Sequence, residues 1–330
     1  MKLLMISTDR KIFEEGSSVR ERMKNYASYL DELHIIIFSS AEFDDQTISN
    51  NCFVYSTKSK TKWLYPFDAI RIGKSIISDK NINNITCQDP FLTAVVGVSL
   101  KKHFSLPLEI QIHTDIGSPN FTYTFGNYIR KKMALRYLPK ANHIRVVSQR
   151  IKKFLVEDSR LNIADSKVEV RSIYVDKNSI KNSPIVTDLH KKFPNFQKIV
   201  LIASRFEPEK NIKLSIEAWK KVVQEIPSAG LVIVGSGSEE LKLKRLVDSF
   251  GINRSVVFEP WQNDLSSYYK TTDLLLLTSF YEGYGMTLVE AHAVGCRIVS
   301  TDVGIAKEVG ANIVPLDSKK IAKKIIEVLV

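Results

Sequence analysis

The segment FYEGYGMTLVEA, from Phe280 to Ala291, has a glutamate on either side of a glycine-containing turn. It follows the apolar run DLLLLTS and leads into a helical pattern. Thr287 and Glu290 fit a T-x-x-E capping box, which by itself accounts for Glu290 as a helix cap. Glu282 lies in the loop before a helix N-terminus, a place that favours anions. A carboxylate there would repel a phosphate unless it bonds to another group of a ligand, such as sugar hydroxyls.

Similar apolar, β-branched runs recur along the whole chain and alternate with helical patterns. The runs before the midpoint cover residues 2–7, 34–38, 52–56, 84–88, 108–113, 143–148 and 168–175. Those after it cover residues 198–204, 231–237, 255–260, 273–279, 296–302 and 311–316. Continuous apolar strands that alternate with helices predict an α/β protein with buried parallel sheets.

The length of 330 residues favours two domains over a single hydrophobic core. Between Lys177 and Phe196 the alternation lapses into polar residues and prolines, which indicates a linker. We therefore predict one Rossmann-like domain over residues 1–178 and another over residues 179–330.

Composition limits the class of protein. The three cysteines, Cys52, Cys87 and Cys296, are an odd number without paired spacing, which argues against a disulfide framework or a zinc site. The N-terminal apolar run is too short for a signal peptide, and no run is long enough for a membrane span. We expect a cytoplasmic protein. The net charge of +11, concentrated in the first half, indicates an acidic partner.

Polar residues just after the strands are the first candidates for a site, because ligands bind beyond the carboxyl ends of parallel strands. Arg205 and Lys210 follow a strand in SRFEPEKN and could clamp a diphosphate. An equally good interpretation is a solvated loop with Pro208 as its turn residue. Gly235 and Gly237 follow the next strand, but a lone G-x-G is a weak signal and usually only turns the chain.

His113 and Asp115 end the run LEIQIHTD, where a histidine is more often structural than catalytic. The stretch from Ile116 to Val156 contains no acidic residue, while its lysines and arginines are interleaved with tyrosines and phenylalanine. A second basic and aromatic run covers Thr57 to Phe67. Such segments suit an anionic membrane surface or a lipid-linked acceptor, although a charge run is usually a solvated face.

Taken together, these motifs resemble the family 4 glycosyltransferases, which have the GT-B fold. SRFEPEKN resembles their G-R-x-x-x-x-K-G loop, and the segment from Glu282 to Glu290 resembles their E-x7-E signature. GSSVRERMKNYASYL, QIHTD and VEVRSIYVD are similar, more loosely, to their first loop, their histidine-bearing strand end and their connection between domains.

The resemblance implies a role for each motif residue. Arg205 and Lys210 would bind the diphosphate of a nucleotide-sugar and stabilise the charge that grows on it. Glu282 and His113 would contact the transferred sugar, and Glu290 would accept from the ribose hydroxyls. The other implied contacts are Trp261 and Gln262 beside the base, the backbone N–H groups of Gly285, Met286 and Thr287, and further donor-site positions at Leu288, Gly235 and Gly16.

Three features depart from the family pattern. The first loop has only Gly16 where the family often has paired glycines, and RSIYVD lacks the family's Pro-Asn-Gly. The sequence ends within the helical pattern SKKIAKKIIEVL, so we expect the C-terminal crossover helix of the fold to be missing.

The resemblance implies a retaining, metal-independent hexosyltransferase that needs no cofactor. It would move a sugar from a nucleotide diphosphate sugar to a glycan or lipid-linked acceptor in cell-surface polysaccharide biosynthesis, as a peripheral protein on the inner face of the membrane. A non-catalytic nucleotide-sugar or glycan-binding protein that keeps the fold is the alternative. No recognised nucleic-acid-binding module accompanies the basic charge, which argues against nucleic acid as a partner.

Overall fold

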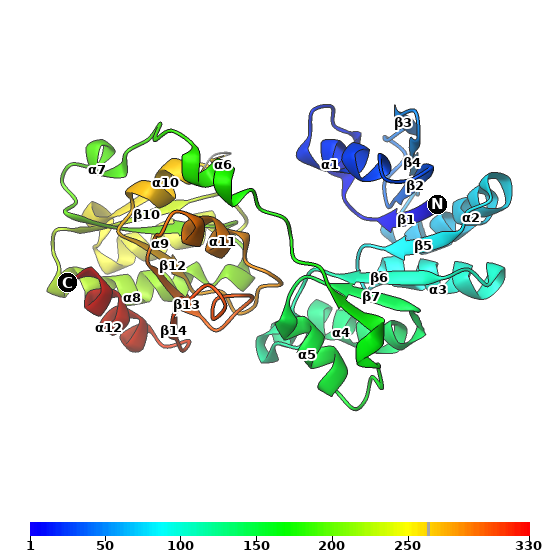
Figure 1. Ribbon diagram of the computed structural model, residues 1–330. Helices are drawn as coiled ribbons and strands as arrows, with labels where there is room; N and C mark the ends of the chain where they lie inside the picture. Colours follow the sequence, from blue (N-terminus) through cyan, green and yellow to red (C-terminus); the bar gives the residue numbers. More distant parts are fainter. Residues whose placement is uncertain (263–264) are drawn as a thin grey trace. The chain divides into compact units, whose positions relative to one another are not determined.

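The computed structural model describes residues 1–262 and 265–330, which form two compact units. The first unit covers Met1–Arg171 and the second covers Ser172–Val330. Figure 1 shows a twisted sheet with flanking helices in each unit. The boundary predicted from sequence, after residue 178, lies inside α6 (Lys177–Asn182). This helix belongs to the second unit because it packs on a helix there, α11 (Met286–Ala293).

The first unit is built on an eight-stranded sheet with the strand order β3-β4-β2-β1-β5-β6-β7-β8. Its strands are β1 (Lys2–Ser7), β2 (Glu32–Ile37), β3 (Gln46–Ser49), β4 (Cys52–Ser56), β5 (Asn84–Cys87), β6 (Leu108–Ile112), β7 (His143–Val146) and β8 (Val168–Val170). All neighbours pair in parallel except β3, which forms an antiparallel edge with β4.

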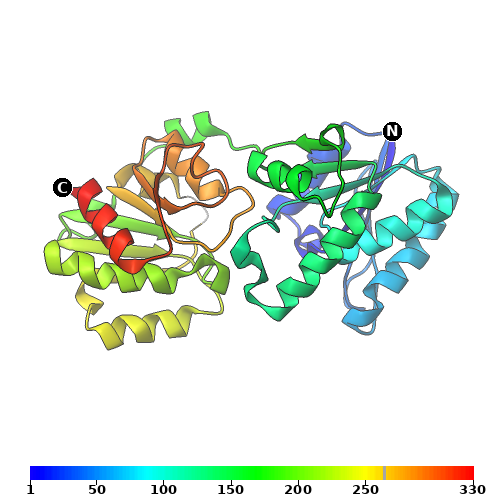
Figure 2. The ribbon, with the colours of Figure 1, turned by 90° about the horizontal axis from the view of Figure 1, so that it is seen from below.

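Five α-helices connect these strands: α1 (Ser18–Ala27), α2 (Tyr65–Lys80), α3 (Leu92–Phe104), α4 (Phe125–Tyr137) and α5 (Gln149–Glu157). Figures 1 and 2 show α2, α3 and α4 on one face of the sheet and α1 on the other. Helices α2, α3 and α4 follow the carboxyl ends of β4, β5 and β6 along the chain. Their N-terminal ends therefore lie along the edge where ligands of parallel sheets bind.

The second unit holds a six-stranded, all-parallel sheet with the order β11-β10-β9-β12-β13-β14. The strands are β9 (Lys198–Ala203), β10 (Ala229–Val234), β11 (Val256–Glu259), β12 (Leu274–Leu277), β13 (Ile298–Thr301) and β14 (Asn312–Val314). Besides α6 and α11, the helices are α7 (Leu189–Lys192), α8 (Ile212–Glu225), α9 (Glu240–Phe250), α10 (Ser266–Thr271) and α12 (Ser318–Leu329).

Both faces of this sheet are covered, as its unbroken apolar strands predict. Val200 and Ile202 of β9 pack with α8, α9 and α12, while Ile199 and Leu201 pack with α10 and α11. Trp219 of α8 is fully buried on the first of these faces. Helix α12 also packs there, against α8. The two sheets confirm the predicted α/β class.

The segment Lys177–Phe196 is not the linker that its prolines and polar residues predict. It contains α6 and α7, and both are docked on the second unit. The backbone N–H of Val186 donates to Ser267 Oγ at 2.9 Å, and that of Leu189 donates to Thr271 Oγ1 at 3.1 Å. The Leu189 side chain is fully buried. We call this segment the strap. Its polar residues predicted a linker, but its hydrogen bonds to α10 and the buried Leu189 hold it on the second unit.

Candidate functional site

The loops after β9 and β12 meet at one edge of the second sheet, because these two parallel strands are neighbours. The backbone N–H of Phe280, after β12, donates to the carbonyl oxygen of Glu209, after β9, at 2.8 Å. The Thr301 hydroxyl at the end of β13 donates to the Ser279 carbonyl oxygen at 2.7 Å. These bonds hold the loop that begins the E-x7-E segment against the loop that carries the two candidate cations.

Lys210 and Glu282 form a direct ion pair at this junction. The Lys210 ammonium donates to Glu282 Oε1 at 2.6 Å, and Ser279 Oγ donates to the same oxygen at 2.7 Å. Only 15% of the lysine side chain and 12% of the glutamate side chain are exposed, so water screens the pair weakly. The ammonium neutralises the carboxylate, which removes the repulsion that Glu282 alone would exert on a phosphate.

Gly304, in the turn after β13, packs closely against the loop that carries Glu282. A side chain there would place Cβ 2.3 Å from the Tyr284 carbonyl oxygen and 3.2 Å from Glu282 Cβ, and φ is +50°. The N–H of the following residue, Ile305, donates to that carbonyl oxygen at 3.0 Å. Gly304 therefore allows the close approach that positions Glu282.

Arg205 lies more openly than Lys210. Its side chain is 61% exposed, and Nη2 donates to Glu209 Oε1 at 3.1 Å. Pro208 begins the short 3₁₀ turn η6 (Pro208–Lys210), as the solvated-loop interpretation expects. The solvated-loop interpretation describes Arg205 and Pro208, whereas the paired and shielded Lys210 does not fit it.

Gly235 owes its conformation to neighbouring backbone. Its φ is +147°, and a Cβ there would lie 1.9 Å from the Ser204 carbonyl oxygen. The N–H of Phe206 donates to the Ser236 carbonyl oxygen at 2.8 Å, so the loops after β9 and β10 run pressed together. Packing between two loops thus accounts for this glycine without a ligand.

Glu290 is not a helix cap, and the capping-box prediction is wrong. Helix α11 has Gly285 as its N-cap, with φ +92° and no side-chain cap, so Thr287 is already the second helical residue. Glu290 Oε2 instead accepts from Tyr269 Oη at 2.9 Å. Burial raises the pKa of Glu290, and the hydrogen bond from Tyr269 opposes that shift. A partly buried carboxylate in the middle of a helix needs a reason other than capping.

A pocket of about 300 Å³ gives that reason. It brings together several residues that the sequence singled out, namely Trp261, Gln262, Met286, Thr287 and Glu290. Met286 and Thr287 open α11, so their N–H groups have no acceptor within the helix. The N–H of Leu288 is different, because it donates to the Gly285 carbonyl oxygen at 3.0 Å, and its side chain is buried in the core.

The pocket also has walls that the sequence did not reveal. Ile180 of α6, Leu265, Ser266 of α10 and Tyr269 complete the lining. Ile180 comes from the strap, which polar composition had assigned to a linker. Tyr269 reads as one more apolar position of a short helix, and no local signal shows that its hydroxyl faces Glu290.

The two predicted site residues of the first unit are His113 and Gly16. His113 follows β6, and its Nε2 lies 3.2 Å from Gln111 Oε1. Gly16 has φ +73° in an exposed turn, with open space where a Cβ would be. It directly precedes Ser17, whose side chain caps α1 by accepting from the N–H of Arg20. Their positions are described within the first unit alone.

Within the described ranges, 1–262 and 265–330, no group of three or more His, Cys, Asp or Glu residues has the arrangement of a metal site. No helix in those same ranges is long and apolar enough to cross a membrane.

Comparison with known proteins gives matches over most of this chain. Residues 187–329 match the family described as glycosyl transferases group 1. An uncharacterized glycosyltransferase of Methanocaldococcus jannaschii is 30% identical over 242 residues, and a second one from that organism is 24% identical over 261 residues. These alignments include 68% and 76% of this chain, and the chain spans 59% and 63% of the two relatives.

Among solved structures, the chain is similar to Anabaena HepE in complex with UDP. The TM-score is 0.73 at 20% sequence identity, with 99% of this chain and 89% of that chain covered. A likeness at this identity establishes the fold, and it confirms the GT-B architecture. Residues 187–329 therefore match the family described as glycosyl transferases group 1, and the chain has the GT-B fold.

Proposed function

We propose that the chain is a retaining, metal-independent glycosyltransferase that moves a sugar from a nucleotide diphosphate sugar to a glycan or lipid-linked acceptor. A role in cell-surface polysaccharide biosynthesis is part of this proposal. The nucleotide-sugar would bind in the second unit. UDP-sugars are the first donors to test, because the similar HepE structure contains UDP.

The contact between Lys210 and Glu282 carries the proposal. A lysine ammonium has three N–H donors, so it can hold Glu282 and a phosphate oxygen at the same time. As the glycosidic bond breaks, negative charge grows on the departing diphosphate. A fixed ammonium in a shielded place stabilises that charge without having to reorganise.

The pocket beside α11 supplies the other half of the site. Trp261 is 55% exposed and lines the pocket, so its ring offers a flat surface for a base. Glu290 lies in the pocket wall and offers carboxylate oxygens to two ribose hydroxyls. The free N–H groups at the start of α11 favour the anionic part of the ligand. In this proposal Glu282 contacts the transferred sugar of the nucleotide-sugar, and Glu290 contacts its ribose.

A donor screen tests this proposal. The protein is incubated with UDP-, GDP- and ADP-sugars, and release of nucleoside diphosphate is measured with and without EDTA. We expect release from at least one donor at a rate that EDTA leaves unchanged, and NMR of the product should show a retained anomeric configuration. Loss of activity in EDTA would contradict metal independence, and an inverted product would contradict the retaining mechanism.

We also propose that exposed aromatic and basic residues of the first unit bind an anionic membrane. Trp63, Phe67 and Phe125 are 88%, 71% and 78% exposed, at the N-terminal ends of α2 and α4. Lys132 lies 5.5 Å from the ring centroid of Tyr128 on α4, so cations and aromatics alternate there. Aromatic rings enter the interface while lysines contact anionic headgroups, each worth about 1 kcal/mol.

We expect the protein to co-sediment with vesicles that contain phosphatidylglycerol and not with neutral phosphatidylcholine vesicles. A Trp63→Ser, Phe125→Ser double variant should lose most of this binding. Tyr29→Ser is the matched control, since Tyr29 is 81% exposed at the end of α1 and outside this surface. Equal sedimentation with both kinds of vesicle would contradict a preference of this surface for anionic membranes.

A further inference from the structure

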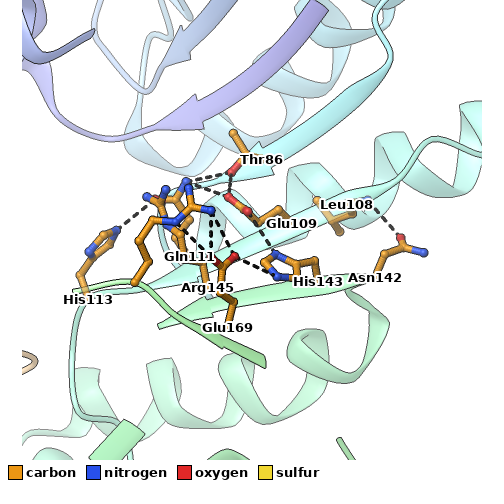
Figure 3. Close-up of polar contacts among 10 residues, drawn as sticks. Thr86, Leu108, Glu109, Gln111, His113, Asn142, His143, Arg145 and Glu169 are labelled. Atoms are coloured by element: carbon orange, nitrogen blue, oxygen red, sulfur yellow. Dashed lines mark hydrogen bonds and ion pairs between the residues drawn. The ribbon is translucent and has the colours of Figure 1, made fainter. Parts of the chain in front are cut away.

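One face of the first sheet carries a connected row of polar side chains. Side chains alternate along a strand, so Glu109, Gln111 and His113 of the β6 segment share this face. Thr86 of β5 and Arg145 of β7 flank them on the two neighbouring strands. Figure 3 shows the row with Gln111 at its centre and His113 at the end nearest the carboxyl edge.

The neighbours of Gln111 determine which way its amide points. Its Nε2 donates to Thr86 Oγ1 at 3.0 Å and to Glu109 Oε1 at 3.1 Å, while its Oε1 accepts from Arg145 Nη2. With the amide reversed, a carbonyl oxygen would face a carboxylate, and an NH₂ group would face a guanidinium that can only donate. Only the observed orientation of the amide satisfies the hydrogen-bonding groups of Gln111, Thr86, Glu109 and Arg145 together.

This orientation determines the tautomer of His113. Its Nε2 lies 3.2 Å from Gln111 Oε1, which is a carbonyl oxygen and can only accept. The hydrogen must therefore be on Nε2, and in an uncharged ring Nδ1 is then the acceptor. Within residues 1–262 and 265–330, no hydrogen bond of the structure involves Nδ1 of His113.

Desolvation and the neighbouring charges keep the ring of His113 uncharged at neutral pH. Desolvation lowers the pKa of His113 to about 4, aided by Arg145 of β7 and Arg22 of α1 and opposed by Glu109 of β6. The residue nevertheless keeps an exposed surface beyond the end of β6.

We propose that Gln111, held by Arg145, Glu109 and Thr86, is a positioning residue that fixes His113 as the Nε2–H tautomer and so presents Nδ1 as a hydrogen-bond acceptor to the substrate. Nδ1 in this form recognises a hydroxyl or N–H group. It does not recognise a carboxylate or phosphate, which would need a donor. The contact made by His113 is therefore to a neutral hydroxyl of a sugar, an assignment that rests on the proposed function.

Ring ¹⁵N shifts of the histidines, measured at pH 7.5, test the tautomer without any assay of activity. The His113 signals are identified by their loss in His113→Ala. We expect the wild-type protein to show Nε2–H with an unprotonated Nδ1, and Gln111→Leu to show a mixture of tautomers. A wild-type His113 with Nδ1 protonated would overturn the proposal, and so would an unchanged tautomer in Gln111→Leu.

Glu32→Gln is the matched control, because Glu32 lies 2.9 Å from Nε2 of another histidine, His34, on β2 of the same sheet. It should change the His34 signals and leave those of His113 as they are. With a donor that the protein turns over, Gln111→Leu should lower the rate about tenfold, as for the loss of one hydrogen bond. The rate of His113→Ala should fall at least as much. The rate of the Gln111→Leu, His113→Ala double variant should fall no further than that of His113→Ala.

The two kinds of measurement separate this inference from the proposed function. If no donor is turned over but the tautomer follows Gln111, the proposed function fails and the positioning of His113 stands. If a donor is turned over and Gln111→Leu matches the wild-type rate, the proposed function stands and the role of Gln111 in it is overturned.

Discussion

Replacing Lys210 by alanine is expected to lower kcat/KM for the nucleotide-sugar by about 100-fold or more, because a charged hydrogen bond to the leaving diphosphate is lost in a shielded site. The same change leaves Glu282 without its ion-pair partner. Its carboxylate then faces the phosphate with its charge uncompensated. Steady-state nucleotide release and calorimetric titration with UDP together measure the effect on turnover and on binding.

Two further variants show whether a loss of activity arises from the chemistry or from the fold. Lys213→Ala removes a lysine that is 70% exposed on the adjacent helix α8, and it should keep wild-type activity. A Lys210→Met, Glu282→Gln double variant removes both charges of the pair, so it should recover thermal stability and remain inactive. Recovery of activity in that double variant would mean that the pair is only structural.

Replacing Glu290 by alanine is expected to weaken UDP binding about tenfold to 100-fold, since the loss of one charged hydrogen bond to a ribose hydroxyl costs about 1.5–3 kcal/mol. The rate at saturating donor should change much less, because the ribose contacts do not change as the bond breaks. Titration calorimetry with UDP measures the affinity. Tyr269→Phe removes only the bond from Oη to Glu290 and should have a smaller effect.

The pH dependence of binding follows from the raised pKa of Glu290. Only the ionised carboxylate accepts from both hydroxyls, so affinity is full above this pKa and falls as the pH is lowered through it. Glu290→Gln should lack this acid-side loss. For folding the sign is opposite: the raised pKa favours the folded state below the ordinary glutamate pKa, and this contribution is lost as the pH rises through the folded value.

Strands were the most predictable part of the fold. Runs such as KIVLIA are buried on both faces, so their apolar character is continuous and hard to mistake. The strand β3, Gln46–Ser49, was missed because it is short, largely polar and pairs only at an edge. The strap was wrongly predicted to be a linker. Its polar residues are anchored on the second unit by hydrogen bonds that composition does not reveal.

The candidate site could be predicted in part. The spacing of Glu282 and Glu290 and the positions of Arg205 and Lys210 carry the family resemblance. The partners of these residues could not be predicted, because Lys210 reaches Glu282 only through the pairing of distant strands. The capping-box error has a local cause. Gly285 adopts a left-handed conformation and starts the helix at Met286, which moves Thr287 out of the cap position.

Release of nucleoside diphosphate by the wild-type protein and by Glu282→Ala, compared side by side with the best donor of the screen, tests the central claim most directly. The proposed site predicts steady release by the wild-type protein and a loss of about 100-fold in the variant. Wild-type UDP binding without any release would favour the non-catalytic alternative. Release by Glu282→Ala at the wild-type rate would contradict the assignment of the site.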